Sequence, residues 1–360
     1  MARIDTFLKL VTEQGASDLH FAAGSIPTIR FSGELMPLPF RELGKAEARR
    51  FLLEILDDSL RKEFEEEKEL DFVHVLDGVG RFRANYYECV GGLGAVFRIV
   101  PEDVPPLDSL GMPEILRELT RIPNGLILVT GPTGAGKTTT LAALLDLINQ
   151  TFPFHIITIE DPVEYIHRPK KSAITQRQVG VHAESFASAL RSALREAPDV
   201  LVVGEMRDLE TISLALQAAE TGVLVFGTLH TDSASKAIDR IIDAVPDSSR
   251  EQVRGVLSVL LRAVVSQILI KRSNGEGRVA AAEVLLQTYA VSHMIREGKV
   301  HQIDGLLQSP ESEQSGMIHM DRSLLRHVQQ GLINLEDAVR VAKYPDELKK
   351  QAAATSREEF

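Results

Sequence analysis

The amino-acid sequence predicts an α/β protein with an N-terminal α+β domain and a C-terminal domain that has a mostly parallel sheet and a helical end. Strand-like segments around glycine turns indicate the first domain, and short apolar runs alternating with helical segments indicate the second. A proline-rich stretch at residues 101–113 separates the two patterns. We therefore expect a first domain at 1–100, a linker at 101–120, a core at 121–285 and a helical region at 286–360.

The first domain is expected to combine amphipathic helices with antiparallel strands. Near the N-terminus, Ile4, Phe7, Leu8 and Val11 recur at helical spacing and give one apolar face. Later segments alternate apolar and polar residues and are separated by glycines, as in strands joined by tight turns. The predicted helices span 2–14, 45–56 and 60–69, and the predicted strands span 18–22, 28–31, 70–76, 79–88 and 94–100.

Strands and helices alternate from residue 125 onward, which is typical of a parallel sheet covered on both faces. The predicted strands span 126–129, 156–159, 200–203, 223–226 and 278–285. The predicted helices span 138–150, 183–196, 250–270, 289–297, 321–331 and 335–343. Polar residues follow several of these strands at their carboxyl ends, where ligands bind in sheets of this kind.

Composition narrows the class of protein. The chain has 360 residues, 44% of them hydrophobic and 25% charged, which is ordinary for a globular protein. A net charge of −11 argues against a non-specific grip on nucleic acid, although it does not speak against a local basic patch. Cys89 is the one cysteine, so no intrachain disulfide forms and a reducing compartment, the cytoplasm, is expected. Because no apolar run approaches about twenty residues, we expect no membrane span.

Residues 131–138 read Gly-Pro-Thr-Gly-Ala-Gly-Lys-Thr and match the phosphate-binding loop of nucleotide-binding proteins. An apolar strand before the loop and a helix after it give the arrangement that this chemistry needs, because the helix N-terminus favours an anion. We expect ATP here, with Lys137 at the β- and γ-phosphates and the Thr138 hydroxyl on Mg²⁺. An ordinary glycine-rich turn is the alternative, but it would need neither the Lys-Thr pair nor the flanking elements. The residues expected around the nucleotide are Gly131, Pro132, Thr133, Gly134, Ala135, Gly136, Lys137, Thr138 and Thr139.

Carboxylates follow two of the predicted strands. Glu160, Asp161 and Glu164 lie close together, which is costly unless a cation or a proton transfer uses them. Mg²⁺ and an attacking water beside a phosphate loop offer that use, so Glu160 and Asp161 are candidate metal ligands. A solvated acidic turn is the alternative. Glu205 ends an apolar strand in the manner of a Walker B element and is expected near the metal, unless it is simply an exposed residue after a buried strand.

One histidine and several arginines are further candidates. His230 follows a predicted strand at the same edge of the sheet as the phosphate loop, so it is either a sensor of the γ-phosphate or an ordinary packed residue. Phosphoryl transfer also needs positive charge at the γ-phosphate. Arg191 and Arg195 share one face of a predicted helix, and Arg83 and Arg98 lie on neighbouring predicted strands. For each arginine, an exposed structural role is the alternative.

Taken in order, these motifs resemble those of the secretion ATPase superfamily of type II secretion and type IV pilus systems, and most of all its twitching-motility retraction ATPases. The resemblance covers about residues 4–345. The matching segments are the Walker A loop at 131–139, the Asp box Thr-Ile-Glu-Asp-Pro-Val-Glu at 158–164, the Walker B region at 190–208, the His box Gly-Thr-Leu-His-Thr at 227–231 and the N-terminal signature Gly-Ala-Ser-Asp-Leu-His at 15–20.

This resemblance implies a homo-hexameric ring in which each chain has a PAS-like N-terminal domain and a RecA-like C-terminal domain. ATP would bind between the two domains and against the next subunit. Within the site, the resemblance implies Glu164 as the general base and Glu205 as the carboxylate beside Mg²⁺. The arginines implied to bring positive charge are Arg83 and Arg98 from the N-terminal domain, and Arg191 and Arg195 toward a neighbouring site.

The implied function is ATP hydrolysis that powers type IV pilus retraction through an inner-membrane platform protein, at the cytoplasmic face of that membrane. A paralogous motor is a further implied partner. Retraction motors usually carry Ala-Ile-Arg-Asn-Leu-Ile-Arg where residues 290–296 read Ala-Val-Ser-His-Met-Ile-Arg, so Ser292 and His293 replace an Arg-Asn pair. An accessory retraction paralogue is therefore a second possible function.

Three more classes of protein share some of these motifs. Assembly and type II secretion ATPases often carry a four-cysteine zinc module, which Cys89 alone cannot form. A RecA-like DNA motor is disfavoured by the acidic balance, so no nucleic-acid partner is expected. A non-catalytic nucleotide-binding scaffold is disfavoured by the acidic residues that follow the strands.

Overall fold

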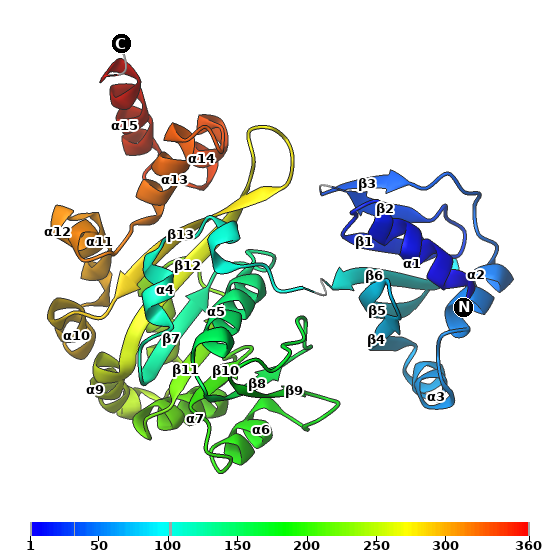
Figure 1. The fold of residues 1–360 in the computed structure, drawn as a ribbon, viewed down its shortest axis with the longest axis horizontal. Helices are drawn as coiled ribbons and strands as arrows, with labels where there is room; N and C mark the ends of the chain where they lie inside the picture. The colour runs from blue at the N-terminus through cyan, green and yellow to red at the C-terminus, as the bar shows by residue number, and fades with distance from the viewer. Residues whose placement is uncertain (1, 32, 101–102, 359–360) are drawn as a thin grey trace. The chain divides into compact units, whose positions relative to one another are not determined.

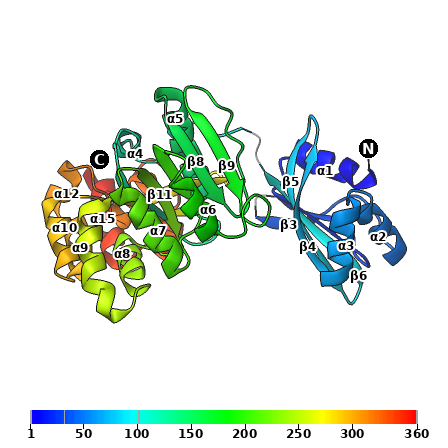
Figure 2. The same cartoon turned by 90° about the horizontal axis from the view of Figure 1, so that it is seen from below.

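The computed structural model describes residues 2–31, 33–100 and 103–358, with side chains described as far as residue 354. Contacts within the chain divide it into two compact units, 1–103 and 104–360. Figures 1 and 2 show the elements of both units. Because each unit has its own sheet and its own core, the two are described one after the other.

The first unit is a six-stranded sheet with helices on one face. All of its strand pairs are antiparallel, and the strand order is β3-β2-β1-β6-β5-β4. Its elements are α1 (Arg3–Glu13), β1 (Asp18–Ala22), β2 (Thr28–Phe31), β3 (Glu34–Pro37), α2 (Lys45–Leu53), α3 (Asp58–Glu67), β4 (Glu69–Leu76), β5 (Gly80–Cys89) and β6 (Gly92–Val100).

The core of the first unit lies between the helices and one face of this sheet. Ile4 of α1, Leu52 of α2 and Phe64 of α3 are almost completely buried, as are Phe97 and Tyr86 on the strands. Strand residues alternate between faces, so the intervening positions of β1, β5 and β6 form the opposite, more polar face. That polar face carries the arginines of interest in this unit.

The second unit is built on a seven-stranded sheet in the order β13-β12-β7-β11-β10-β8-β9. Every pair is parallel except β12 with β13. The strands are β7 (Gly125–Thr130), β8 (His155–Glu160), β9 (Ala173–Gln178), β10 (Val200–Val203), β11 (Leu224–Leu229), β12 (Leu261–Lys271) and β13 (Arg278–Leu286). Parallel strands place all their carboxyl ends at one edge, where the phosphate loop and the acidic residues emerge.

Helices cover both faces of this sheet (Figures 1 and 2). One face is covered by η1 (Leu107–Leu110), α4 (Ile115–Leu119) and α5 (Lys137–Thr151). The other face is covered by α6 (Phe186–Ala193), α7 (Leu209–Glu220), α8 (Ala234–Asp243) and α9 (Arg250–Leu260), with η2 (Asp247–Ser249) between the last two. The C-terminal helices are α10 (Tyr289–Arg296), η3 (Val300–Gln302), α11 (Ile303–Gln308), α12 (Pro310–Gln314), α13 (Met320–Gln329), α14 (Leu335–Val341) and α15 (Pro345–Glu358).

The prediction of a helix over residues 250–270 was wrong in its second half. The helix α9 ends at Leu260, and β12 begins directly after it at Leu261. β12 lies between β7 and β13 and is buried on both faces, so its residues are apolar at consecutive positions such as Val264 and Val265. A strand of this kind lacks the period-two pattern that distinguishes strands from helices in a sequence. The strands β3 and β9 were not predicted either.

The predicted fold class is confirmed. The first unit is an antiparallel α+β domain, and the second combines a mostly parallel sheet with helices on both faces and further helices at its C-terminal end. In the part of the chain that the structure describes, no helix combines the length and the apolar character needed to cross a bilayer.

Candidate nucleotide site

The glycine-rich loop connects β7 to α5. The backbone φ of Gly131 is +147°, and that of Gly136, which caps α5, is +85°. Glycine adopts such angles without the steric cost that a β-carbon brings. A β-carbon at Gly131 would lie 2.3 Å from the carbonyl oxygen of Gln267, so the loop is pressed against β12. The 15-residue helix α5 then begins at Lys137, and its free N–H groups and dipole favour an anion at the loop.

Two polar residues of β12 support the loop from behind. The side-chain amide of Gln267 donates a hydrogen bond of 2.7 Å to the carbonyl oxygen of Ala135. The hydroxyls of Ser266 and Thr130 lie 2.6 Å apart at the end of β7. The exposed tip of the loop consists of Pro132, Thr133 and Gly134. Neither β12 residue was predicted from the sequence, although a polar Ser-Gln pair inside an apolar run was a signal for them.

Lys137 lies at the centre of the loop. Its ammonium group donates hydrogen bonds to the carbonyl oxygens of Gly131 at 2.7 Å and Pro132 at 3.1 Å. It also lies 3.5 Å from Nδ1 of His230. Burial lowers the pKa of Lys137, and the negative charges of Glu205 and Glu164 oppose that shift. The loop lysine, the His box and two of the expected carboxylates therefore meet at one edge of the sheet.

Glu205 follows β10 and has two cationic or potentially cationic neighbours. Its Oε1 lies 2.6 Å from Nε of Arg207 and 3.3 Å from Nε2 of His230. Burial acts to raise the pKa of Glu205, but the hydrogen bond and charge of Arg207, together with His230, outweigh it and lower that pKa. Glu205 is thus held as a carboxylate. Arg207 was not predicted as a site residue, since its contact with Glu205 depends on how the chain turns after β10.

The acidic residues after β8 have different surroundings. The carboxylate of Glu160 accepts hydrogen bonds from the Thr158 hydroxyl at 2.6 Å and from the Gln176 amide at 3.2 Å. Burial nonetheless raises the pKa of Glu160. Asp161 lies close enough to Arg207 to help raise the pKa of that guanidinium, whose main cause is its hydrogen bond with Glu205. The contacts of Glu160 are therefore with β8 and β9, whereas Asp161 lies near Arg207, the partner of Glu205.

The start of α5 offers hydroxyl groups beside the loop. The hydroxyl of Thr139 lies 3.1 Å from that of Tyr165, while the Thr138 hydroxyl has no hydrogen-bond partner among the described residues. Within those residues, no three His, Cys, Asp or Glu side chains form a metal-binding group. A Mg²⁺ ion at a phosphate loop does not need one, because phosphate oxygens and water supply most of its ligands. Thr138 and Glu205 fit such an ion better than Glu160 does.

Two expected arginines lie at α6. Arg191 forms an ion pair with Glu210 of α7, and the guanidinium of Arg195 donates a hydrogen bond of 2.8 Å to the backbone oxygen of Arg191. Both side chains are thus ordered by contacts at the surface of the second unit. Within that unit, the structure joins neither of them to Lys137 or Glu205 by a described contact.

The other two expected arginines lie on the polar face of the first unit. Residues that are paired in register form a row across β2, β1, β6 and β5, namely Arg30, Asp18, Arg98 and Arg83. Asp18 is only 3% exposed, and its carboxylate lies 2.8 Å from Nε of Arg98 and 3.8 Å from Nε of Arg30. Arg83 makes a looser pair with Asp71 at 3.9 Å. One buried acid thus holds two of three neighbouring arginines, which leaves a net positive row on this face.

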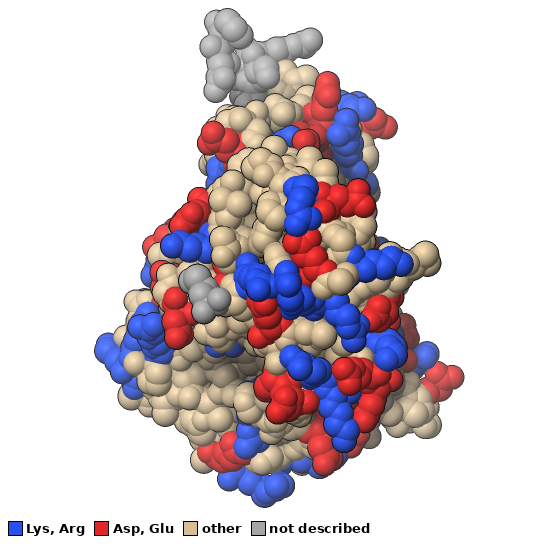
Figure 3. All heavy atoms as spheres, turned by 90° about the vertical axis from the view of Figure 1, so that its right-hand side faces the viewer, with Lys and Arg blue, Asp and Glu red and all other residues tan. Residues whose placement is uncertain are grey.

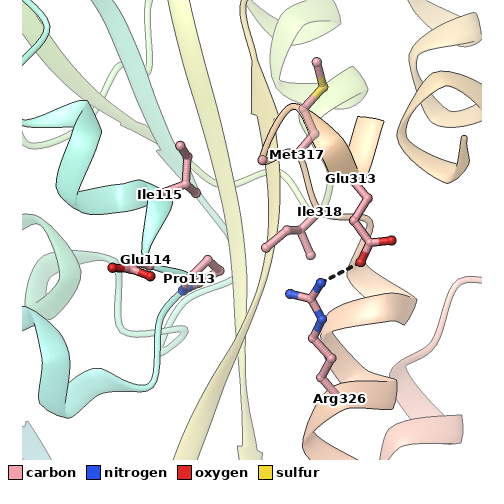
Figure 4. A pocket seen from close by; sticks show the side chains of 8 residues that line it. Pro113, Glu114, Ile115, Glu313, Met317, Ile318 and Arg326 are labelled. Carbon is pink, nitrogen blue, oxygen red and sulfur yellow. Dashed lines mark hydrogen bonds and ion pairs between the residues drawn. The ribbon is translucent and has the colours of Figure 1, made fainter. Parts of the chain in front are cut away.

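Two cavities of the second unit lie away from the loop. One has a volume of about 180 Å³ and lies between the start of α4 and the segment from α12 to α13, where Glu313 and Arg326 form an ion pair at 2.7 Å (Figure 4). Its lining residues are Pro113, Glu114, Ile115, Glu313, Gly316, Met317, Ile318 and Arg326. The other, of about 300 Å³, is lined by residues that include Pro123, Pro198 and Thr221. Neither is lined by a residue of the phosphate loop.

Comparison with known proteins gives consistent matches along the chain. The family described as "Type II/IV secretion system protein" matches residues 2–340. The "Type IV pilus retractation ATPase PilT" of Pseudomonas aeruginosa is 48% identical over 343 residues, which cover 95% of this chain and 99% of that protein. The "Twitching motility protein" of Neisseria gonorrhoeae is 49% identical over 317 residues, covering 88% of this chain and 84% of that protein. The crystal structure of the pilus retraction motor PilT with bound ADP superposes with a TM-score of 0.88 at 45% identity, covering 97% of this chain and 99% of that one.

Proposed function

The chain belongs to the type II/IV secretion system protein family, and we propose that it is the ATPase motor that powers retraction of type IV pili. One observation carries the proposal: Lys137 of the phosphate loop, His230 and Glu205 lie in contact at the edge of the sheet. This constellation places a cation that can bind phosphate beside a histidine and an ionised carboxylate, and phosphoryl transfer depends on such positioned charges. The similarity to a retraction ATPase over 99% of its length supports the choice of pilus retraction.

In this proposal, the residues of the loop bind the nucleotide and Mg²⁺. The backbone N–H groups of residues 133–139 face the phosphates, and Lys137 compensates the charge of the β- and γ-phosphates. Mg²⁺ would be held by Thr138 and by Glu205, directly or through water, with Asp161 nearby. When bound, the ion would neutralise part of the phosphate charge. Glu164 is the proposed general base, since its charge already acts on Lys137. Glu160 bonds to Thr158 of β8 and Gln176 of β9, so we assign it a structural role and not that of a metal ligand.

Positive charge for the transferred phosphoryl group is proposed to come from arginines. Arg98, which Asp18 holds in place, and Arg83 act from the first unit. Arg191 and Arg195 of the second unit act toward the site of a neighbouring subunit in a homo-hexamer. An arginine supplied in this way is typically worth about 10³–10⁵ in rate.

The proposed partners are an inner-membrane platform protein of the pilus and a paralogous motor, with the protein at the cytoplasmic face of that membrane. Nucleic acid is not a proposed partner. On the face that Figure 3 shows, Lys and Arg side chains lie among Asp and Glu side chains, and the chain has a net charge of −11. Both features are unfavourable for a grip on a polyanion.

Steady-state ATP turnover of the purified chain tests the catalytic part of the proposal. Lys137→Ala and Glu205→Ala are expected to lower kcat at least about 100-fold, as the loss of preorganised charge at a reacting centre does. Lys171→Ala is the matched control, because Lys171 is an exposed lysine of the same unit whose ammonium group donates a hydrogen bond of 3.4 Å to the backbone oxygen of Thr151. Turnover of Lys137→Ala at the wild-type rate would refute the site.

A deletion strain tests the direction of force. Loss of a retraction motor leaves cells with pili but without twitching motility, and the wild-type gene restores motility whereas the Lys137→Ala gene does not. Cells without pili would indicate an assembly motor instead. An accessory retraction paralogue is the second candidate. It is favoured by Ser292 and His293 of α10, which replace an Arg-Asn pair usual in retraction motors and are not among the buried residues of that helix. In that case motility persists in the deletion strain under low load.

A further inference from the structure

Glu283 is a buried carboxylate that the proposed chemistry does not use. It lies in the middle of β13 and is only 1% exposed. Its Oε1 accepts a hydrogen bond of 2.8 Å from the backbone N–H of Ala234. The backbone N–H of Met320 lies near enough to the carboxylate to help lower its pKa. Burial raises the pKa of Glu283, and these two N–H groups oppose the shift. Such a residue is costly to bury, so its contacts need an explanation.

These two N–H groups belong to the first residues of two helices. Ala234 begins α8, and Met320 begins α13. The N–H groups in the first turn of a helix have no partner within the helix, and the helix dipole favours a negative charge there. One carboxylate therefore caps α8 and lies near the N-terminus of α13, two helices that are far apart in the sequence. Each of these helices also has a local cap, Ser233 and His319, which bond to other N–H groups.

The helix α8 is attached to the candidate nucleotide site. Only residues 231–233 separate Ala234 from His230, which contacts both Lys137 and Glu205. The His230 loop is therefore joined to the N-terminus of α8 by three residues. Glu283 meets that N-terminus from β13, a different part of the sheet.

Glu283 also lies in register with the end of the phosphate-loop strand. It is paired with Ser266 of β12, and Ser266 is paired with Thr130 of β7, the residue before the loop. The hydroxyls of Ser266 and Thr130 lie 2.6 Å apart. Glu283 is thus the outer member of a polar row that begins at the phosphate loop.

On its other side, β13 is fastened to the C-terminal helices. Val284, next to Glu283, exchanges two backbone hydrogen bonds of 2.8 and 2.9 Å with Ile318. The helix α13 lies against β13 (Figure 1). His327 of α13 contacts the backbone oxygen of Ala280 at 2.8 Å. A movement of β13 at Glu283 would therefore also move the segment that leads into α13.

From these contacts we infer that Glu283 is a positioning residue that couples the His230 loop to α13, so that the nucleotide state of the site reaches the C-terminal helices. The inference rests on the proposed function of the nucleotide site. It assigns the coupling to one carboxylate that bonds to the N-terminus of α8 and lies near the N-terminus of α13, on a strand that pairs with Ile318 just before α13. A helix cap without this role would contribute to folding alone.

Hydrogen exchange of the full-length chain, with and without ADP, tests the inference. In the wild type, ADP is expected to change exchange both in the peptide that contains Ala234 and in the peptide that contains Met320. In Glu283→Gln, which keeps the size of the side chain, the ADP effect on the first peptide remains and that on the second is lost. The kcat of this variant falls about tenfold while the Kd for ADP stays within about twofold of wild type.

Asp321→Asn is the matched control. Asp321 is a buried acid of α13 that accepts hydrogen bonds from the backbone N–H groups of Lys343 and Tyr344, so its loss loosens the C-terminal helices without touching α8. We expect this variant to keep both ADP effects and the wild-type kcat. Equal losses of turnover in the two variants would overturn the specific role of Glu283, as would a wild-type chain in which ADP leaves the Met320 peptide unchanged.

The same measurements separate this inference from the proposed function. If the wild type neither binds ADP nor hydrolyses ATP, the nucleotide site itself is wrong. If the wild type does both and Glu283→Gln retains the ADP effect at the Met320 peptide, only the coupling role falls.

Discussion

A pair of glycine substitutions tests whether the phosphate loop is pressed against β12. Gly131 and Gly134 both have left-handed backbone angles, with φ of +147° and +78°. They differ in what a β-carbon would meet. At Gly131 it would lie 2.3 Å from the Gln267 carbonyl oxygen, a contact that real β-carbons do not make, whereas at Gly134 it would enter open space. Gly134→Ala is therefore the matched control for Gly131→Ala.

The magnitudes follow from these two geometries. Left-handed strain costs an alanine about 1–2 kcal/mol, and this is the whole effect expected at Gly134. In Gly131→Ala the new β-carbon also overlaps the backbone of the central strand β12, which must shift. Overpacking of this kind costs about 1–3 kcal/mol more. For a unit of this size, each kcal/mol lowers Tm by about 2–4 °C. Calorimetry of the two variants should therefore show Gly131→Ala unfolding about 2–12 °C below Gly134→Ala.

Nucleotide binding gives a second readout of the same perturbation. A shift of Gly131 displaces one of the two carbonyl oxygens that hold the Lys137 ammonium, so the affinity of Gly131→Ala for ADP should fall at least about tenfold. Equal Tm values for the two variants, together with a wild-type ADP affinity for Gly131→Ala, would show that the loop is not held against β12.

Three further predictions concern other parts of the molecule. Arg207→Ala removes the partner that most lowers the pKa of Glu205, so that pKa rises and the acid limb of the pH profile of kcat should move to higher pH; an unmoved limb would show that Glu205 does not control it. Asp18→Asn removes the charge between two arginines of the first unit, and we expect a loss of about 1–3 kcal/mol in the unfolding free energy of that unit by urea titration. The double change Ser292→Arg with His293→Asn is expected to leave ATP turnover within about twofold of wild type, because α10 lies outside the candidate site, while retraction speed measured in cells increases.

The parts of the site that the sequence predicts are those with a local signature. The phosphate loop has a fixed spacing of glycines, Lys137 and Thr138, and the strands before Glu205 and His230 are short apolar runs with polar ends. In a parallel sheet these ends meet at one edge, so the contact of His230 with both Lys137 and Glu205 follows from topology. Periodicity and strand order were sufficient for this much of the arrangement.

The remaining features depend on tertiary structure. β12 is apolar on both faces, so its periodicity could not separate it from a helix, and the support that Gln267 gives the loop was lost with it. Arg207 meets Glu205, two residues before it, only because the irregular segment after β10 directs the two side chains toward each other. Glu160 and Glu164 have the same side chain, and only burial and hydrogen bonding distinguish a carboxylate fixed by Thr158 from one that acts on Lys137.

The geometry of His230 explains how one ring can serve both sides of the site. Its Nδ1 lies 3.5 Å from the Lys137 ammonium, which has only protons to offer, so this nitrogen must present a lone pair. Its Nε2 lies 3.3 Å from Oε1 of Glu205, which can only accept, so this nitrogen must carry the proton. A proton on Nε2 and a lone pair on Nδ1 match both neighbours. A change at either the lysine or the carboxylate therefore alters the hydrogen bonding of the same ring, and the loop that follows it leads directly into α8.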